Sequence, residues 1–416
     1  MKSKSKKDFA IITNVNEKFL NELEEKLHFK SLFASYMGLI KYKLRISKLG
    51  EGNKRNKPCF CGSGKKYKNC CLLKDKKEYN FSDIQEEHKR DWNEKICLAP
   101  EELKKECSQE FIKAHTISKS SNLKQISNNG HVMGFKMALE PKPIKRLIKI
   151  GISKASGINM FCKKHDNELF SILEDKKFTF TNQQIFMLSY RAICKELYQK
   201  YASVKSCNMI LNMLVNDMLN YDSIEEITEF LGLTKLAVRD FEEIKKIFDN
   251  DIIKKDYDNI KYYCLIIDTI PQIMTSCAYL PSIDFNKNKI FDIFDEKAFY
   301  NYISVSTLAL ENGGAIIFSW ISKDDITNEY CKQFIQSIDK LSNKGKCGAL
   351  LNWFFTCSEN IFWSEEWWNL LNDNQRNMIS IFNDDISQNE TLNPEEYENM
   401  WSLLKWNIIE IKQNIF

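Results

Sequence analysis

Four cysteines are crowded into one short stretch near the start of the chain. Cys59, Cys61, Cys70 and Cys71 have the spacing C-x-C-x8-C-C, whereas the whole chain of 416 residues holds 14 cysteines. Thiolates are soft ligands that bind Zn²⁺ tetrahedrally, and the C-x-C arm and the Cys70–Cys71 pair can together close one four-ligand site. The stretch has too few large apolar residues to form a core, so a metal would supply most of its folding energy.

The residues from Pro58 to Cys71 resemble the SEC-C motif, a zinc-binding module first known from the bacterial preprotein-translocase ATPase. That motif reads roughly C-x-C-G-S-G-x-K-[YF]-K-x-C-[HC], and this chain reads CFCGSGKKYKNCC. The resemblance covers about residues 57–73 and implies zinc binding, with Cys71 standing where the translocase has histidine. Because the motif recurs as an appended module on many bacterial proteins, it implies no role in secretion.

A second set of metal-ligand residues is spread over residues 95–175. Cys162 and His165 have the C-x2-H spacing of a zinc knuckle, and Cys97 and Cys107 could complete a four-ligand site. We therefore expect a second Zn²⁺ here. The alternative is a lone Cys–His pair without metal.

The same region resembles the treble-clef layout of HNH-type nucleases, through its cysteine pair, the phrase AHTI around His115 and a knuckle that opens a helix. The resemblance implies that His115 is the general base, that His131 or Asn167 lies beside a catalytic Mg²⁺ or Mn²⁺, and that His165 is structural. The chain departs from the family in its C-x9-C first pair, its long insert and its lack of an acidic residue at an obvious metal position. The alternative is that His115 is an ordinary core histidine.

Other candidate sites have weaker patterns. Four carboxylates near predicted strands could chelate Mg²⁺, but their spacing does not require it and ordinary surface carboxylates explain them better: Asp268, Asp284, Glu311 and Glu359. The sequence contains no P-loop, no Rossmann glycine pattern and no G-x-S-x-G elbow. The absence of these three motifs disfavours P-loop nucleotide hydrolysis, dinucleotide redox chemistry and α/β-hydrolase chemistry.

Charge is distributed unevenly along the chain, although the formal net charge is only +4. Residues 1–80 carry 20 Lys and Arg against 8 Asp and Glu, a net charge of +12. Residues 357–416 carry 3 basic against 11 acidic residues, a net charge of −8. A basic N-terminal part can bind nucleic acid, a ribosome or an acidic protein surface. A solvated basic surface, or attraction between the two ends of the chain, is the alternative.

The cellular compartment can be predicted from the apolar stretches of the sequence. The basic start precedes no apolar stretch of signal-peptide length, and no apolar run reaches the length of a membrane span. We therefore expect a cytoplasmic protein that binds no membrane and keeps its thiols reduced, so that metal binding rather than disulfide formation explains its clustered cysteines. The oligomeric state is left open.

Hydrophobic periodicity predicts an α+β protein that is mostly helical, with a small antiparallel sheet in its C-terminal half. Helices are expected over residues 14–48, 82–94, 184–201 and 223–248, the last interrupted near Gly232, and in a final helix from Pro394 through Ile411. Strands are expected over 262–270, 273–280, 289–294 and 300–321, the last as a hairpin with an Asn-Gly turn. The expected domains are a basic head and linker (1–56), the SEC-C module (57–80), a treble-clef-like region (81–180), a helical region (181–260) and an α+β domain (261–416).

Two functions from different classes fit these patterns. The first is a zinc-binding protein whose basic head and SEC-C module bind nucleic acid, a ribosome or a protein partner. The second is an HNH-like nuclease that uses His115 and a divalent cation. The combination of an SEC-C motif, an HNH-like knuckle and an unfamiliar body also resembles bacterial phage-defence proteins. The zinc-ligand patterns are stronger than the catalytic ones, and the sequence therefore favours binding.

Overall fold

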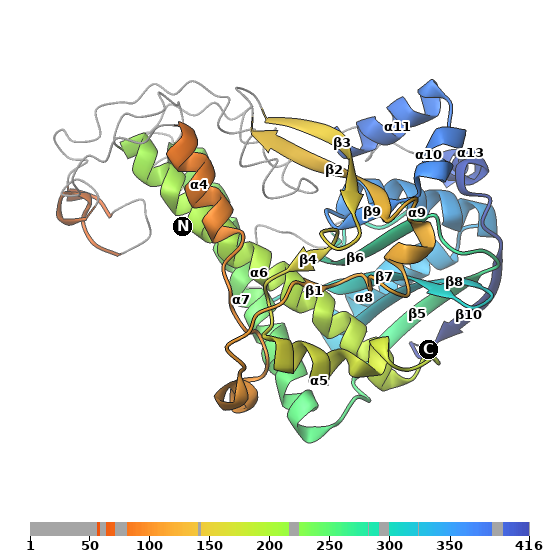
Figure 1. The fold of residues 1–416 in the computed structure, drawn as a ribbon, viewed down its shortest axis with the longest axis horizontal. Coiled ribbons are helices and arrows are strands. Elements are labelled where there is room, and N and C mark those ends of the chain that lie inside the picture. The colour runs from red at the N-terminus through yellow and green to blue at the C-terminus, as the bar shows by residue number, and fades with distance from the viewer. Residues whose placement is uncertain are drawn as a thin grey trace. The chain divides into compact units, whose positions relative to one another are not determined.

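A computed structural model describes residues 56–58, 64–70, 81–139, 143–215, 224–281, 283–290, 299–322, 324–384 and 394–415 (Figure 1). The chain divides into two compact units. Unit 1 comprises residues 1–93, 137–144 and 199–238, and unit 2 comprises residues 94–136, 145–198 and 239–416. The predicted helix over 14–48 lies outside the described residues. Within those residues, no helix is long and apolar enough to cross a membrane.

The described part of unit 1 is mostly helical. It contains the short turn η2 (Tyr67–Asn69), helix α4 (Phe81–Asp91) and parts of the long helices α6 (Asn182–Val215) and α7 (Ile224–Lys254). The indole Nε1 of Trp92, directly after α4, donates to Ser206 Oγ on α6 at 3.2 Å, and His88 Nδ1 lies 3.4 Å from the same hydroxyl. Burial lowers the pKa of His88 to about 4, so its imidazole is neutral at physiological pH.

Unit 2 is organised around a sheet of eight strands in the order β10-β5-β8-β7-β6-β9-β2-β3. The strands span β2 (His131–Leu139), β3 (Pro143–Gly151), β5 (Ile260–Ile267), β6 (Ile273–Tyr279), β7 (Ile303–Leu310), β8 (Gly313–Ile321), β9 (Ile361–Trp363) and β10 (Ile408–Gln413). The predicted hairpin is β7–β8, antiparallel and closed at Leu310↔Gly313. A Cβ on Gly313 would lie 2.1 Å from the Ile267 carbonyl oxygen, so only glycine fits there.

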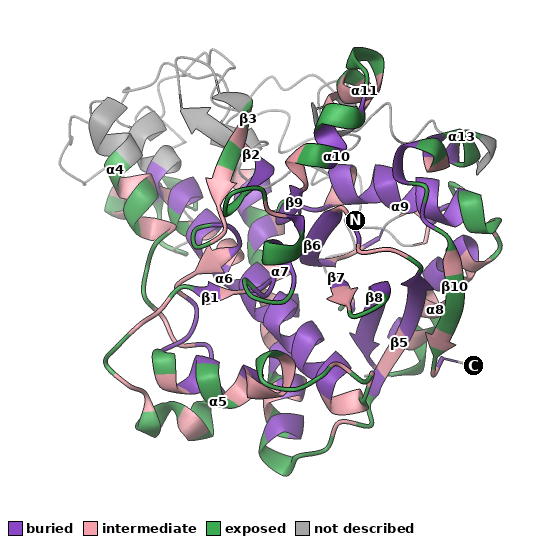
Figure 2. Ribbon diagram, turned by 45° about the vertical axis from the view of Figure 1, so that its right-hand side comes forward, coloured by how far each residue is buried: buried purple, intermediate pink, exposed green. Residues whose placement is uncertain are grey.

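Helices cover the two faces of this sheet. One face buries a core that includes Trp320, Trp363 and Trp406 and is shared with helices α8 (Asp325–Asp339), α9 (Asn343–Cys357), α10 (Glu365–Leu370), α11 (Asp373–Asp384) and α13 (Pro394–Leu404) (Figure 2). Neighbouring side chains along a strand point to opposite faces. Val305 belongs to this core, whereas Ser304 donates to Ser189 on α6 at 2.7 Å, so α6 lies on the other face.

A small two-stranded sheet precedes helix α5. Strands β1 (Ala114–His115) and β4 (Gly157–Ile158) pair antiparallel and are followed by α5 (Lys163–Glu174), with the turns η4 (Glu101–Glu106) and η5 (Leu123–Ile126) on either side of β1. The hairpin β2–β3 is inserted between the two short strands and joins the large sheet. The long insert noted in the sequence is therefore structural, because it extends the main sheet.

The α+β class and the antiparallel sheet are confirmed, but the sheet is larger than expected. Part of the prediction for the last helix is wrong: α13 ends at Leu404, and Ile408–Gln413 form the edge strand β10 against β5. The expected interruption at Gly232 is also wrong, since α7 runs through it with open space where a Cβ would lie. Of the expected strand over 289–294, residues 291–294 lie outside the described residues, and Lys289 forms a single bridge with Ile283.

Candidate metal centre

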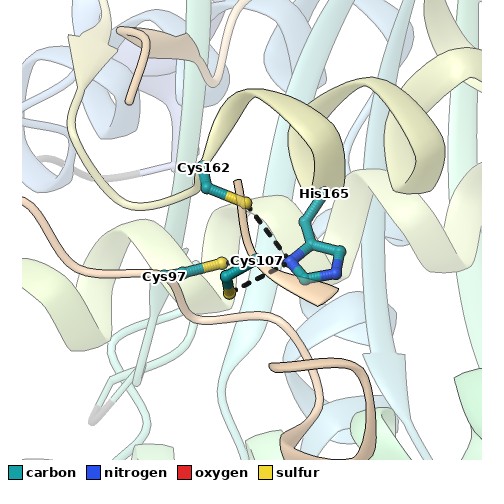
Figure 3. A group of neighbouring side chains, drawn as sticks. All are labelled: Cys97, Cys107, Cys162 and His165. Carbon is teal, nitrogen blue, oxygen red and sulfur yellow. Dashed lines mark hydrogen bonds between the residues drawn. The ribbon is translucent and has the colours of Figure 1, made fainter. Parts of the chain in front are cut away.

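Three thiols and one imidazole meet at the start of α5 in unit 2 (Figure 3). Cys97 lies in an extended segment, and Cys107 directly follows η4. Cys162 is the N-cap residue of α5, and His165 lies in its first turn. The C-x2-H spacing thus puts two ligands at one helix start, and the chain brings the other two to them from 55 or more residues earlier.

The spacing of the four ligand atoms suits a tetrahedral zinc ion. His165 Nδ1 lies 3.4 Å from Cys97 Sγ, 3.5 Å from Cys107 Sγ and 3.4 Å from Cys162 Sγ. With Zn–S of about 2.3 Å and Zn–N of about 2.0–2.1 Å, tetrahedral geometry places sulfur and nitrogen about 3.5 Å apart. All four ligand atoms lie within 4.8 Å of one another. A Cys₃His set closes the coordination sphere with protein ligands, which is typical of structural zinc.

The electrostatics of the thiols also favour a cation. Burial, together with the adjacent Cys97 and Cys162, raises the pKa of Cys107 to about 12. Burial also disfavours the thiolate of Cys162, but the backbone of His165 and the hydroxyl of Ser108 hydrogen-bond to it, and the pKa of Cys162 falls below its usual value. Several thiolates this close together repel one another unless a positive ion lies between them. Zn²⁺ would supply that charge and hold the thiols deprotonated.

Backbone hydrogen bonds fix the ligand-bearing segments to each other. Ile96 N donates to Asn159 O at 3.2 Å, and Leu98 N donates to Met160 O at 3.0 Å. These bonds bracket Cys97 and tie its segment to the residues just before Cys162. On the other side, Lys163 N donates to Glu110 O at 2.9 Å. The ligands are therefore positioned by the chain itself as well as by any metal.

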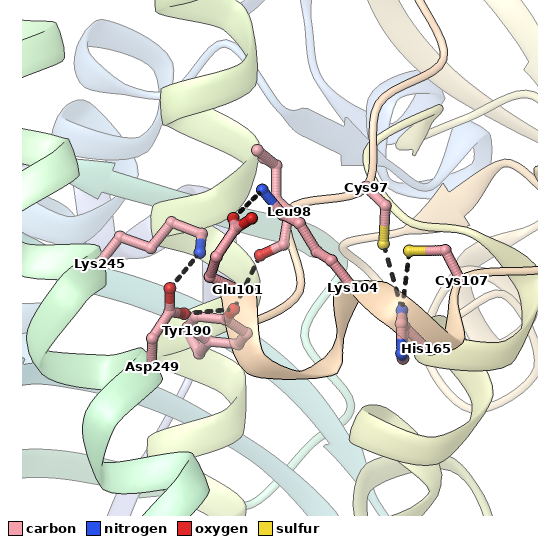
Figure 4. Close-up of polar contacts among 9 residues, drawn as sticks. All are labelled: Cys97, Leu98, Glu101, Lys104, Cys107, His165, Tyr190, Lys245 and Asp249. Atoms are coloured by element: carbon pink, nitrogen blue, oxygen red, sulfur yellow. Dashed lines mark hydrogen bonds and ion pairs between the residues drawn. The ribbon is translucent and has the colours of Figure 1, made fainter.

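A buried polar network on α6 and α7 holds the segment that carries Cys97 through a hydrogen bond to the neighbouring residue Leu98 (Figure 4). The hydroxyl of Tyr190 lies 2.9 Å from the Leu98 carbonyl oxygen and 2.8 Å from Asp249 Oδ1, and it can donate to either. Lys245 Nζ donates to Asp249 Oδ2 at 2.5 Å. Burial raises the pKa of Tyr190 well above its usual value, so this hydroxyl stays protonated. In the sequence Tyr190 fits only an apolar helix stripe, and no local pattern reveals its second role.

The predicted nuclease residues do not gather around a second metal. His115 lies on β1, with its carbonyl accepting from Arg191 Nη1 at 3.0 Å and its buried Nε2 without a hydrogen-bond partner among the described residues. Burial lowers the pKa of His115. His131 and Asn167 are exposed. Within the described parts of the chain, the Cys₃His cluster is the single group of three or more His, Cys, Asp or Glu side chains close enough to share an ion.

The candidate magnesium carboxylates have structural partners instead. Asp268 accepts from the backbone and side chain of Asn407, at 3.1 and 2.7 Å. Asp284 accepts from Asn286 N at 2.8 Å and from Asn288 N at 2.9 Å, which closes a tight turn. Glu311 pairs with Lys177 at 2.6 Å. These contacts account for the three carboxylates without a metal.

In the first cysteine cluster, Cys70 lies within the described residues, whereas Cys59, Cys61 and Cys71 lie outside them. Pro58 pairs with Lys66 as an antiparallel bridge, and Tyr67 N donates to Lys57 O at 2.9 Å. Gly64 has φ 70°, a left-handed conformation that glycine adopts freely. Lys57 and Pro58 thus lie beside Lys66 and Tyr67, and the four-cysteine site itself stays a prediction.

Residues 55–73 match the SEC-C motif. SEC-C is a zinc-binding motif, and this match confirms the resemblance seen in the sequence. The match covers a small part of the chain. No curated protein matches the chain, and no solved structure matches it.

Proposed function

We propose that this chain is a zinc-stabilised binding protein with two zinc ions, one in the SEC-C module and one in the Cys₃His centre. The proposal rests on the four protein ligand atoms at the start of α5, which lie at the separations that tetrahedral zinc coordination requires. Four protein ligands leave no open position for a water nucleophile, so this zinc would hold structure and perform no chemistry.

Metal analysis of protein purified without chelator tests the two sites. We expect about two zinc ions per chain, and about one in either Cys70→Ser or Cys162→Ser. Cys194→Ala is the matched control, because Cys194 is fully buried on α6 and is not a ligand, and it should keep both ions. One zinc in the wild type would eliminate one site, and the variant that leaves the content unchanged would identify which.

We further propose that the bound partner is nucleic acid, held through the basic N-terminal part. The net charge of +12 over residues 1–80 supports this partner. Because binding would release counterions from several phosphates, the affinity for a generic duplex or single strand should fall on the order of tenfold or more between low and physiological salt. A variant lacking residues 1–57 should lose most of this binding. Nucleic-acid binding that survives the deletion, or that ignores salt, would contradict this proposal, and the absence of any binding would leave a protein or ribosomal partner as the alternative.

A nuclease is the second candidate, and one observation favours it. Strand β1, which carries His115, pairs with β4 directly before the knuckle helix, in the order that the treble-clef resemblance implies. The test is cleavage of plasmid, single-stranded DNA and RNA with Mg²⁺ or Mn²⁺, by the wild type and His115→Ala. We expect no cleavage by the wild type. Cleavage that disappears in a folded, zinc-loaded His115→Ala variant would replace the binding proposal with a catalytic one.

A further inference from the structure

Unit 2 contains a cavity of about 440 Å³ that neither zinc site explains. Its walls come from the segment after β1, the end of α5, the first turns of α6 and the strands β6 and β7. Figure 1 labels these helices and strands. The size is within the range of small-molecule sites. Because α5 begins at the Cys₃His centre and ends at this wall, one helix positions both features.

The cavity wall is rich in hydroxyl groups, and one buried hydroxyl among them has no hydrogen-bond partner in the part of the chain that the structure describes. The hydroxyl-bearing residues of the wall include Thr116, Ser118, Thr275, Ser276, Ser306 and Thr307. Thr116 Oγ1 accepts from Asn360 at 2.7 Å, and Thr275 Oγ1 lies 2.6 Å from Ser358 Oγ. Ser276 is 2% exposed, yet its Oγ has no hydrogen-bond partner among the described residues. A buried hydroxyl normally finds a partner, and a ligand would supply one.

A buried guanidinium in the same wall is also incompletely satisfied. Arg191 is 1% exposed, and its Nη1 and Nη2 donate to His115 O at 3.0 Å and to Glu174 Oε1 at 2.9 Å. Its Nε is buried and has no partner within the described chain. Among the charged lining residues, Arg191 pairs with Glu174 and Lys177 pairs with Glu311, so that Lys176 gives the wall a net charge of +1. A buried donor and a net positive charge suit an oxyanion.

The rest of the wall offers flat aromatic surface. Phe178 and Phe180 both line the cavity and pack edge to face, with ring centroids 5.0 Å apart. Phe180 has φ 62°, in the left-handed region that a bulky residue rarely adopts. Residues with such strained backbone conformations are concentrated at ligand sites. The energetic cost of the strain is tolerated there because the side chain must lie in a particular place.

We propose that this cavity binds a mononucleotide, with its phosphate beside Arg191 and Ser276 and its base against Phe178 and Phe180. The guanidinium and hydroxyl donors match a phosphate, and the aromatic rings match a planar base. The proposal is independent of the partner that binds the N-terminal part.

Calorimetric titration of the zinc-loaded full chain with AMP, GMP, CMP and UMP tests this site. We expect at least one of them to bind with a Kd in the micromolar to low millimolar range, and the matching nucleoside and inorganic phosphate to bind about tenfold more weakly. Ser276→Ala should weaken the nucleotide about fivefold or more, through the loss of one hydrogen bond to a charged group. Phe180→Leu should weaken the nucleotide but leave inorganic phosphate unchanged.

Ser304→Ala is the matched control for Ser276→Ala. Ser304 is also a buried strand serine, but it bonds to Ser189 and Ser319 and does not line the cavity. Without ligand, Ser276→Ala should melt like the wild type and Ser304→Ala should melt lower, whereas only Ser276→Ala should lose affinity. No binding of any nucleotide at millimolar concentration, a nucleoside that binds as tightly as its nucleotide, or an unchanged affinity in Ser276→Ala would each overturn the proposal.

Discussion

The two cysteine clusters use the same ligand chemistry in very different surroundings. Of the described residues of the SEC-C module, Tyr67 is the one buried large side chain, at 4% exposure. The Cys₃His centre lies against fully buried aromatic residues, including Phe161, Phe170 and Tyr190. In the module, metal would have to supply most of the folding energy, whereas at the centre the surrounding core shares that role. A ligand pattern alone therefore does not tell how much a fold depends on its metal.

The largest expected effect is that of Cys162→Ser. The change leaves two thiols and an imidazole beside a helix start inside unit 2, so we expect loss of that zinc and a fall in the free energy of unfolding of about 3 kcal/mol or more. Chemical denaturation followed by tryptophan fluorescence measures it, because several tryptophans lie in the unit 2 core. If the variant has lost this zinc but unfolds at the same denaturant midpoint as the wild type, the hydrophobic core and not the metal stabilises this region.

A smaller effect is expected from Tyr190→Phe, which removes the hydroxyl between Leu98 and Asp249 and keeps the ring. The loss of this buried hydrogen bond should cost about 1–3 kcal/mol. Zinc content should stay at two, but a chelator should remove zinc from the Cys₃His centre faster because the Cys97 segment is held less firmly. The release rate with a colorimetric chelator reports this, and an unchanged rate would assign the hydroxyl to general stability alone.

The smallest effect on unit 2 is expected from Cys70→Ser. Because the SEC-C module has little core of its own, losing its zinc should unfold residues 57–73 and leave the unfolding transition of unit 2 unchanged. Limited proteolysis should show new cleavage between Lys65 and Lys74 beside an intact larger fragment. A large drop in melting temperature would mean instead that the module is part of a larger core, and the contrast between the two clusters would fail.

The sequence by itself predicted both ligand sets, and the structure brings the four residues of the Cys₃His set together. Cys162 and His165 are three positions apart at one helix start, and local spacing of this kind is fixed by helix geometry whatever surrounds it. The four thiols of the SEC-C motif are likewise predicted from local spacing, in a short stretch that contains two glycines. Sequence reasoning also paired Cys97 and Cys107 with the knuckle, because thiols that are not in disulfides and lie near a knuckle have few other uses.

Only the tertiary structure decided features that depend on partners distant in the chain. Ile408 and Ile411 fit a helical stripe, yet they form β10 because the edge of β5 offers unpaired backbone groups to the end of the chain. Ser276 and Arg191 both line the cavity, although they are 85 positions apart in the sequence. No local sequence pattern relates residues at that separation. Hydrophobic periodicity reflects structure within a few residues along the chain. Strand pairing and burial depend on which distant segments pack together, and no local sequence pattern encodes that choice.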